Sequence, residues 1–438
     1  MMHLWRRRVI AGALAISCFP GTAWAVSEVD ILLNKLVERG IVSSDDAGII
    51  RREIAEAKEA RTTELAKEIV PEPDRRWTWK GDVRLRDEYR NREGEGEASD
   101  AHRQRIRFRY GFEGPVTDQL KVEARIATGT SSTGGTGGDP VSTNQSFDTN
   151  LVKKNINLDL ANVRYTPAIS GVDSVALVGG IHQNPMWTVG PLVWDGDLSF
   201  DGAAVQVKHM VREGVDLFSS GGFALLDTGE SETPMFWYTQ GGAELQPMPN
   251  AEGEFFKRLK LKGAVAYHDY KNVIRSKSSV DVIAREAQNS AAANDFNQIN
   301  PSIELSSTVA AVPVALFWNW ARNTSAPSEQ NDGFQFGLKA GRAKPALTFD
   351  NIPGWLRDGI EGGYYFQQLE RDAVFDEFAD SDFNDGGTNN RGHVFYVTLA
   401  TLKHSTLGAK YAVTRQLDEA VAGKDHEDRI QVDWVTTF

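Results

Sequence analysis

Apolar and polar residues alternate in short runs along most of the chain from Trp77 onward. Successive side chains of a β-strand point to opposite faces, so a period of two predicts strands with one apolar and one polar face. In Trp77–Tyr89, tryptophan, valine, leucine and tyrosine share one parity, whereas lysine, aspartate and arginine share the other. The pattern predicts about sixteen strands, with eighteen as the alternative number. They cover residues 77–89, 103–112, 120–126, 151–165, 174–182, 201–211, 214–226, 235–246, 258–270, 302–310, 314–323, 333–341, 358–372, 393–401, 406–415 and 429–438.

The connections between the first strands alternate between long and tight. Asn91–Ala101 is long and polar, Gly114–Asp118 is tight, and Thr130–Asn150 is long and rich in glycine and serine. Long loops at one end and tight turns at the other are typical of transmembrane barrels, which also have an even number of strands. The predicted fold is therefore all-β, a transmembrane antiparallel up-and-down β-barrel over residues 75–438. Residues 247–257 and 342–357 would then be unusually long turns.

The last predicted strand, 429–438, places Ile430, Val432, Trp434 and Phe438 on one parity. A half-apolar strand at this point needs a partner, and a closed barrel provides one by pairing the last strand with the first. An aromatic residue in the final position also resembles the signal by which outer-membrane barrels are recognised for assembly. We therefore expect Trp434 and Phe438 to form an assembly signal.

The first 25 residues have the organisation of a cleaved export signal. A basic stretch at positions 6–8 precedes the apolar run Val9–Phe19, and Ala23–Ala25 has the small-x-small pattern of a cleavage site. The apolar run is too short for a spanning helix, which needs about 20 residues. We predict a signal peptide over residues 1–25.

Residues 26–74 show helical rather than strand-like patterning. Val29–Arg39 and Asp45–Val70 are the two predicted helices, and Ser43–Asp45 can cap the second one. Pro71 and Pro73 end the segment. We expect a periplasmic helical segment and a proline linker before the barrel.

Charge and cysteine content restrict the partners and the chemistry. The formal charge of the whole chain is −12, and removal of residues 1–25, which hold three arginines and no acids, changes it to −15. A chain this acidic is not expected to bind nucleic acid. Cys18 is the only cysteine and lies in the predicted signal peptide, so no disulfide is expected. The mean hydropathy of −0.38 suits a barrel in which half of each strand faces water.

We find no motif for a nucleophile, a nucleotide or a metal ion, and the histidines are scattered. The run Asp380–Gly386 superficially resembles a calcium loop, but its glycine comes one place late and Arg391 stands where the glutamate should be. A solvated acidic extracellular loop is the better interpretation. The sequence therefore predicts no cofactor and no enzymatic activity.

Rows of basic residues on the polar parity are the strongest functional feature. In a soluble sheet they would only be a solvated face, but in a barrel they would line the lumen, where charge tunes selectivity. The basic pore-lining candidates are Arg84, Arg86, Arg103, Arg105, Arg107, Arg109, Lys121 and Arg125.

Several short motifs resemble the putative porin family of Gram-negative bacteria. The block Gly179–Gly202 contains Asn-Pro, Trp-Asp and Asp-Leu pairs in the order of that family, and Gly81–Tyr89 and Leu158–Pro167 are similar to other parts of it. The chain departs from the family at Met186, where an aromatic residue is expected. The resemblance implies an outer-membrane porin and does not imply a particular solute.

The third predicted extracellular loop, His182–Phe200, is unusually apolar for a loop. Exposure of such a run to water would be unfavourable, so we expect it to fold back into the lumen. Asp195 and Asp197 would then face the arginine rows across the narrowest point. The alternative is that the two aspartates only cap a turn.

The sequence thus indicates an outer-membrane porin of a Gram-negative bacterium that passes small polar solutes or ions by passive diffusion. Its expected partners are membrane lipid, the outer-membrane assembly machinery, small polar solutes and, by analogy with general porins, two further copies in a homotrimer. Two other functions fit the sequence less well. They are a barrel-borne enzyme such as a lipase or protease, and a secreted carbohydrate-binding β-sandwich.

Overall fold

The computed structural model describes two units of the chain, Met1–Arg75 and Arg76–Phe438. The described residues are 35–39, 43, 46–50, 52, 77–93, 100–129, 138–147, 150–226, 233–273, 289, 296–326, 328–343, 359–402, 404–418 and 426–438. The predicted signal peptide and most of the second predicted helix lie outside them. In the first unit, residues 35–38 and 46–50 are helical, and the Asp46 amide donates to Ser43 Oγ at 3.1 Å, as expected for a helix cap. No helix among the described residues is long and apolar enough to cross a membrane.

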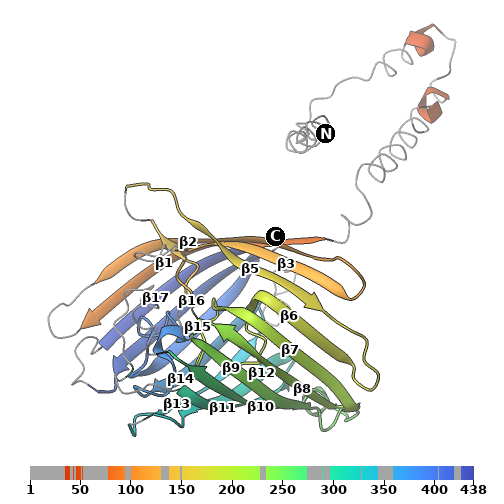
Figure 1. Cartoon of the computed structure of the whole chain (residues 1–438). Coiled ribbons are helices and arrows are strands. Elements are labelled where there is room, and N and C mark those ends of the chain that lie inside the picture. The colour runs from red at the N-terminus through yellow and green to blue at the C-terminus, as the bar shows by residue number, and fades with distance from the viewer. Residues whose placement is uncertain are drawn as a thin grey trace, which may run out of the picture. The chain divides into compact units, whose positions relative to one another are not determined.

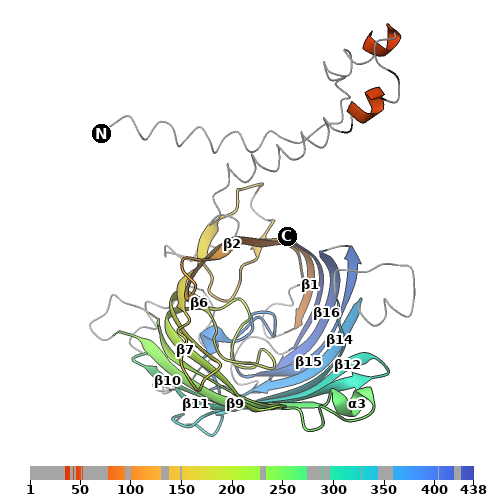
Figure 2. The ribbon, with the colours of Figure 1, turned by 90° about the vertical axis from the view of Figure 1, so that its right-hand side faces the viewer.

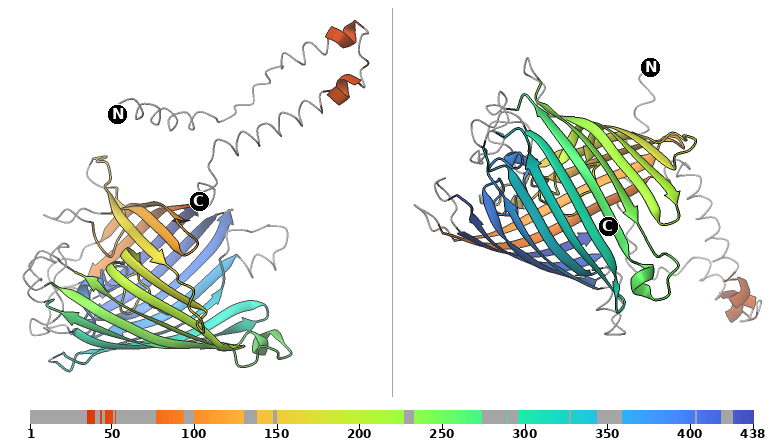
Figure 3. Two further views of the ribbon diagram at one scale, coloured as in Figure 1. Left: turned by 45° about the vertical axis from the view of Figure 1, so that its right-hand side comes forward. Right: turned by 90° about the horizontal axis from the view of Figure 1, so that it is seen from below.

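The second unit is a closed antiparallel β-barrel (Figures 1, 2 and 3). One sheet contains all seventeen strands of the described part, and sixteen of them form the wall because β4 has only two residues. Apart from β4, each strand pairs with its neighbours in sequence, and β1 pairs with β17. The strands are β1 Thr78–Glu93, β2 Ala101–Pro115, β3 Leu120–Thr128, β4 Gln145–Ser146, β5 Ile156–Tyr165, β6 Ser174–Gln183, β7 Ser199–Arg212, β8 Val215–Leu225, β9 Met235–Leu245, β10 Lys260–Lys271, β11 Phe296–Val309, β12 Val312–Asn323, β13 Asp332–Gly341, β14 Ile360–Leu369, β15 Asn390–Leu402, β16 Ser405–Gln416 and β17 His426–Thr437.

The predicted fold class and strand number are confirmed. Each predicted strand corresponds to one observed wall strand, and closure of the sheet rules out the β-sandwich alternative. The boundaries differ most at the long-loop end, where β11 begins at Phe296 rather than 302 and β17 begins at His426 rather than 429. These strand starts carry polar residues on both parities, so alternation could not reveal them. The pattern also missed β4, which pairs with Arg105 and Ile106 of β2.

The barrel closes where β1 meets β17. The register runs from Asp82 opposite Thr437 to Glu93 opposite His426. Beyond it, Gly81 and Phe438 exchange two backbone hydrogen bonds of 2.9 and 3.0 Å. A Cβ on Gly81 would lie 2.5 Å from the Phe438 ring, so only glycine leaves room for this ring against the first strand.

The outer face of the barrel is apolar, as the alternation predicts. Large apolar side chains are exposed on strands all around the wall, for example Leu85, Val265, Trp318, Phe395 and Trp434. Such a continuous apolar band is what a transmembrane barrel presents to lipid. Aromatic residues gather near the tight-turn end, where Trp79 stacks on Tyr110 with ring centroids 5.6 Å apart.

The turns at one end of the barrel are short, and one of the two long ones contains a helix. β11 and β12 are joined by Ala310 and Ala311, both with positive φ, as in the tight hairpins that match strand twist. The connection between β9 and β10 contains α3, Glu254–Lys257, which accounts for part of its length. Most of the other long turn, residues 344–358, lies outside the described residues.

Two connections at the other end fold into the barrel. We call residues 184–198, between β6 and β7, loop 3, and residues 370–389, between β14 and β15, loop 7. Leu192 in loop 3 and Val374 in loop 7 are fully buried, and both belong to a single apolar cluster with inward residues of β7–β11. Figure 2 shows these loops inside the ring of strands. The prediction that the third loop folds inward is therefore confirmed by its burial.

Candidate functional site

The arginine rows on β1 and β2 face the inside of the barrel and lie opposite each other. The β1–β2 register places Arg84 opposite Arg107 and Arg86 opposite Arg105. Like charges directly opposite on one face destabilise a sheet unless other groups compensate for them. The compensation comes from acids of β1 and β17 and from the inward-folded loops.

The outer members of the rows are compensated within β1 itself. Asp82 accepts hydrogen bonds from Nε of Arg107 at 2.9 Å and from Nε of Arg109 at 2.7 Å. Glu88 accepts one from Nε of Arg103 at 2.5 Å. These acids fall on the same parity as the arginines, so their compensating role follows from the alternation.

Arg86 connects the barrel wall to loop 7. Its Nε and one terminal nitrogen donate to the two carboxylate oxygens of Asp433 on β17, at 2.7 and 2.8 Å. Its other terminal nitrogen lies 2.9 Å from both carboxylate oxygens of Asp382 in loop 7. Paired donors of this kind fix orientation as well as charge, and Arg86 is only 5% exposed. The contact ties loop 7 to the arginine side of the lumen.

Arg84 and Arg105 have neutral partners. Nε and one terminal nitrogen of Arg84 donate to Asn144 Oδ1, at 3.2 and 2.5 Å, and Arg105 donates to Ser142 Oγ at 3.3 Å. In the described part of the chain neither forms an ion pair. These two arginines therefore carry the least compensated positive charge of the rows.

Loop 3 reaches the arginine rows through Asp197. One of its carboxylate oxygens accepts from the amide and hydroxyl of Thr143, at 3.1 and 2.9 Å, and the other lies 3.8 and 3.7 Å from Arg107 and Arg109. Burial alone would raise the pKa of Asp197, but Arg107, Arg84 and the Thr143 hydrogen bonds lower it below the ordinary value. Asp197 thus meets the arginines directly instead of facing them across a gap.

Asp195 has a different environment. Its Oδ1 accepts from the Asp197 amide and its Oδ2 from the Ser381 amide, both at 2.8 Å. It therefore caps a turn, as the alternative interpretation held, and it also binds loop 3 to loop 7. Burial and the neighbouring Asp380 raise the pKa of the Asp195 carboxyl to about 8.

The expectation of a solvated acidic loop at Asp380–Gly386 is wrong. Asp380 is only 9% exposed and Asn384 is fully buried, because loop 7 is folded into the barrel. Asp382 contacts Arg86, and its Oδ1 accepts from Gln431 at 2.9 Å. Burial would raise the pKa of Asp382, but Arg86, Lys410 and Arg429 hold it well below the ordinary value. No group of three metal-ligating side chains occurs among the described residues.

The sequence is matched by the model of a known family, described as putative porin, over residues 94–313 and 318–438. The chain belongs to the putative porin family. It is therefore an outer-membrane channel protein, and the apolar band of the barrel is its lipid-facing surface. No curated protein matched the sequence.

Comparison with solved structures matches porins at low sequence identity. Pseudomonas putida OprB is 11% identical with a TM-score of 0.49, over 83% of this chain and 95% of that one. The outer-membrane channel DcaP of Acinetobacter baumannii is 12% identical, and Salmonella typhi OmpF in complex with daunomycin is 10% identical. Both have TM-scores of 0.46 and are matched over 83% of this chain and 97% of their own. The closed barrel of this porin is established by the pairing of its own strands.

Two predicted pore-lining residues lie apart from the loop contacts. Arg125 of β3 forms an ion pair of 2.5 Å with Asp159 of β5, and Lys121 is exposed near the tight-turn end. The sequence also missed a group on β17 that belongs to the charged wall. Arg429 is 1% exposed and contacts Glu427 and Asp385. It shares the polar parity of Gln431 and Asp433, and this parity was the sequence signal that could have identified it.

Loop 3 of the porin is anchored on the side opposite the arginines. Trp194 lies against the rings of Phe200, Phe236 and Phe378, with centroids 5.2 to 6.0 Å apart. At the other end of the loop, the amide and carbonyl of Trp187 form hydrogen bonds with the Gln240 side chain, at 2.8 and 2.9 Å. The loop therefore presents apolar residues to one wall and the Asp197 carboxylate to the other.

Proposed function

We propose that this porin passes small polar solutes and ions by passive diffusion, and that selectivity is set where loops 3 and 7 meet the arginine rows. The observation that carries the proposal is that Asp197 of loop 3 and Asp382 of loop 7 both contact arginines of the barrel wall. Loops 3 and 7 and strands β1 and β2 thus border the same part of the lumen. Charges placed in such a constriction act on solutes more strongly than they would in bulk water.

The local charge balance favours anions at this point. The rows of β1 and β2 hold six arginines, and four of them, Arg86, Arg103, Arg107 and Arg109, contact five acids, namely Asp82, Glu88, Asp197, Asp382 and Asp433. The remaining imbalance resides on Arg84 and Arg105, whose partners are neutral. We infer that these two arginines attract anionic or polar groups of passing solutes.

The proposal also covers the surroundings of the barrel. Residues 1–25 act as a signal peptide, residues 26–74 remain in the periplasm, and the strand that carries Trp434 and Phe438 is the one recognised by the assembly machinery. A homotrimer, the assembly of general porins, is the proposed oligomer. Deletion of Phe438 tests the assembly role, since it should deplete folded, heat-modifiable protein from the outer membrane.

The experiment is ion conductance in planar bilayers, with the reversal potential measured in a salt gradient. Wild-type protein should form channels, and the double variant Arg84→Gln/Arg105→Gln should shift selectivity toward cations. Asp197→Asn should shift it toward anions, because Arg107 and Arg109 lose one of their two acidic partners and keep only Asp82. Asp195→Asn is the matched control in the same loop and should leave the reversal potential unchanged. Absence of channels would contradict diffusion through a pore, whereas equal reversal potentials for all variants would remove this site from the pore.

A further inference from the structure

In the part of the chain that the structure describes, the barrel wall has an opening, a stretch without strand pairing, along one seam. β5 and β6 pair there only between Ala161–Tyr165 and Leu177–Ile181. β5 nevertheless begins at Ile156, and β6 continues to Gln183, where it still pairs with β7. The two strands therefore separate toward the long-loop end, as the ribbon in Figure 1 shows.

A glycine lies next to the end of the paired region. Gly180 has a φ of +114°, and a Cβ at this position would lie 2.2 Å from the carbonyl oxygen of Ala161. Only glycine adopts this conformation without strain, and here it lets β6 approach the β5 backbone closely at the last paired residues. Beside it, the Asn162 side chain donates to the Ile181 carbonyl at 3.1 Å. The point where pairing ends is thus fixed by a glycine and by a side-chain hydrogen bond.

A cavity of about 610 Å³ lies behind the opening. Leu158 of β5, which is 59% exposed, and Asp201 of β7 line it at the outer surface. Phe200, Phe236 and Phe378, each at most 7% exposed, line the same cavity from within. The cavity therefore extends from the outer wall to the aromatic interior, and its size suits a small organic molecule.

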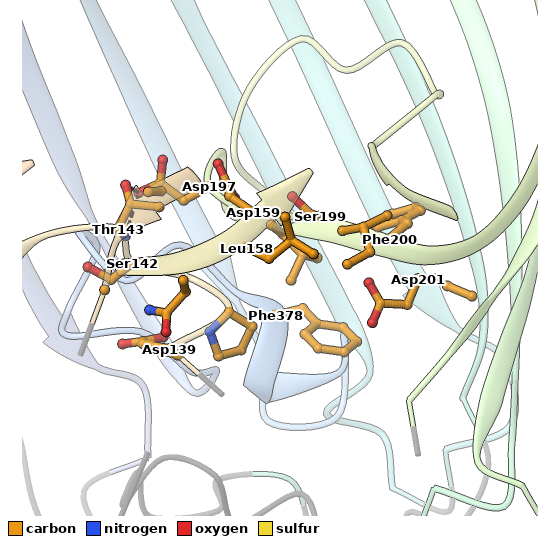
Figure 4. A pocket seen from close by; sticks show the side chains of 18 of the residues that line it. Asp139, Ser142, Thr143, Leu158, Asp159, Asp197, Ser199, Phe200, Asp201 and Phe378 are labelled. Carbon is orange, nitrogen blue, oxygen red and sulfur yellow. Dashed lines mark hydrogen bonds between the residues drawn. The ribbon is translucent and has the colours of Figure 1, made fainter. Parts of the chain in front are cut away.

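The chemistry of the lining is aromatic and acidic. Among the described residues that line the cavity none is basic, and five are acids: Asp139, Asp159, Asp197, Asp201 and Glu377. Asp159 and Asp197 are paired with arginines outside the lining. Figure 4 shows Asp139, Asp197 and Asp201 around one space with Phe378. Ser199 Oγ in the same lining is buried and has no hydrogen-bond partner among the described residues. A buried hydroxyl without a partner is uncommon and indicates a place where a ligand group can bind.

We propose that this cavity binds a hydrophobic organic cation, and that the opening between β5 and β6 admits it from the side. The apolar body of the ligand lies against Phe200, Phe236 and Phe378, and its positive charge lies among the carboxylates. Aromatic faces and carboxylates both attract organic cations, and a desolvated site strengthens the attraction. This binding role goes beyond passive diffusion, because it requires a specific site in the wall.

Binding is tested by calorimetry on the purified full-length porin in a neutral detergent. The probe is tetraphenylphosphonium, and tetraphenylborate is the control of the same shape and opposite charge. The cation should bind one site per barrel, and the anion should bind at least ten times more weakly. The double variant Asp201→Asn/Glu377→Gln should weaken cation binding at least tenfold, whereas Asp216→Asn, at the tight-turn end of β8, should not change it. Equal binding of both ions, or of the cation to wild type and double variant, would overturn the proposal.

The side entrance is tested with a reversible cross-link. Leu158→Cys and Gln183→Cys place two exposed thiols on opposite edges of the opening, and Cys18 is the only native cysteine. A bis-methanethiosulfonate reagent should slow cation association at least tenfold in stopped-flow tryptophan fluorescence, and reductant should restore the rate. Each single-cysteine variant treated with the same reagent should bind at the wild-type rate. An unchanged rate in the cross-linked protein with normal heat-modifiable migration would show that the ligand does not use this entrance.

Discussion

Two regions of the inner barrel wall contrast in chemistry although the strands that form them alternate in the same way. The arginine wall comprises the inward residues of β1, β2 and β17, which are mostly charged and paired with one another. The aromatic wall comprises five buried inward aromatic residues of β7, β9, β10 and β11: Phe200, Phe236, Tyr238, Tyr270 and Phe296. Loops 3 and 7 pack on the aromatic wall and extend their carboxylates toward the arginine wall.

The contrast separates what holds the loops from what acts on solutes. Aromatic pairs contribute about 0.5–1.5 kcal/mol each beyond the area they bury, and the aromatic wall provides many such contacts. Ion pairs that border water contribute little, about 0–1 kcal/mol in the median case. The aromatic wall therefore holds the loops in place, and the arginine wall provides the charge that solutes meet.

The largest expected effect follows removal of the aromatic anchor. Trp194→Ala should destabilise the barrel by about 3–5 kcal/mol, as large-to-small substitutions in packed cores do. Because Trp194 touches both the wall and Phe378 of loop 7, conductance should rise as the loops lose their position. Urea unfolding in detergent and single-channel recording measure the two effects. Trp237→Ala, on the same side of the barrel but 48% exposed on the lipid face, is the control that should leave conductance unchanged.

On the outer face, a charged substitution should destabilise the barrel equally beside the arginine wall and beside the aromatic wall. Phe108→Arg beside the arginine wall and Val265→Arg beside the aromatic wall should each cost about 2–4 kcal/mol, if these mid-strand sites lie near the bilayer midplane. Refolding stability in lipid vesicles measures the cost. Lys121→Arg on the inner face should cost nothing. A large difference between Phe108→Arg and Val265→Arg would mean that one of the two sites does not face lipid.

Removal of Arg86 tests the arginine wall at the arginine that contacts both β17 and loop 7. Arg86→Met should cost about 2–3 kcal/mol, below the usual 3–5 for a broken buried pair because Asp382 and Asp433 keep some solvent contact. The double variant Arg86→Met/Asp382→Asn should recover part of the loss, since fewer unpaired carboxylates remain. Urea unfolding of the full cycle measures the coupling. Strictly additive costs would show that Arg86 does not hold loop 7.

The smallest expected effect is on the pH dependence of stability, because the pKa values of the loop carboxyl groups are shifted in opposite directions. The raised pKa of Asp195, about 8, means that the folded protein binds this proton more tightly than the unfolded chain, so its contribution to stability falls as pH rises from about 4 to 8. Asp197 and Asp382 have lowered pKa values, so their contribution is present above pH 4 and is lost only in acid. Burial also raises the pKa of Asp380, so between pH 5 and 8 the loop carboxyls that contribute to the change are Asp195 and Asp380.

Thermal unfolding of wild type and Asp195→Asn at pH 5 and pH 8 measures this difference. The wild-type melting temperature should fall at pH 8, and the variant should show a flatter profile. A wild-type melting temperature that rises with pH over this range would contradict the assignment.

Alternation of apolar and polar residues determined the barrel, because every strand of a membrane barrel must present one face to lipid and one to the lumen. It identified all sixteen wall strands and the inward direction of the arginines. It also identified loop 3 as a segment that water would not accommodate, since its tryptophans, leucine and valine exceed what an exposed loop carries.

Only the tertiary structure decided which charges meet. Asp195 and Asp197 are two residues apart and chemically identical, yet one binds loop 7 and the other binds the arginines. Loop 7 shows no apolar excess around Asp380–Gly386, so its burial beside Arg86 could not be read from its own residues. These contacts join residues that are up to 347 positions apart in sequence, and their formation depends on barrel closure and on the aromatic wall that positions the loops. Local pattern specifies the faces of a strand, but contacts across the lumen depend on where the packed loops come to rest.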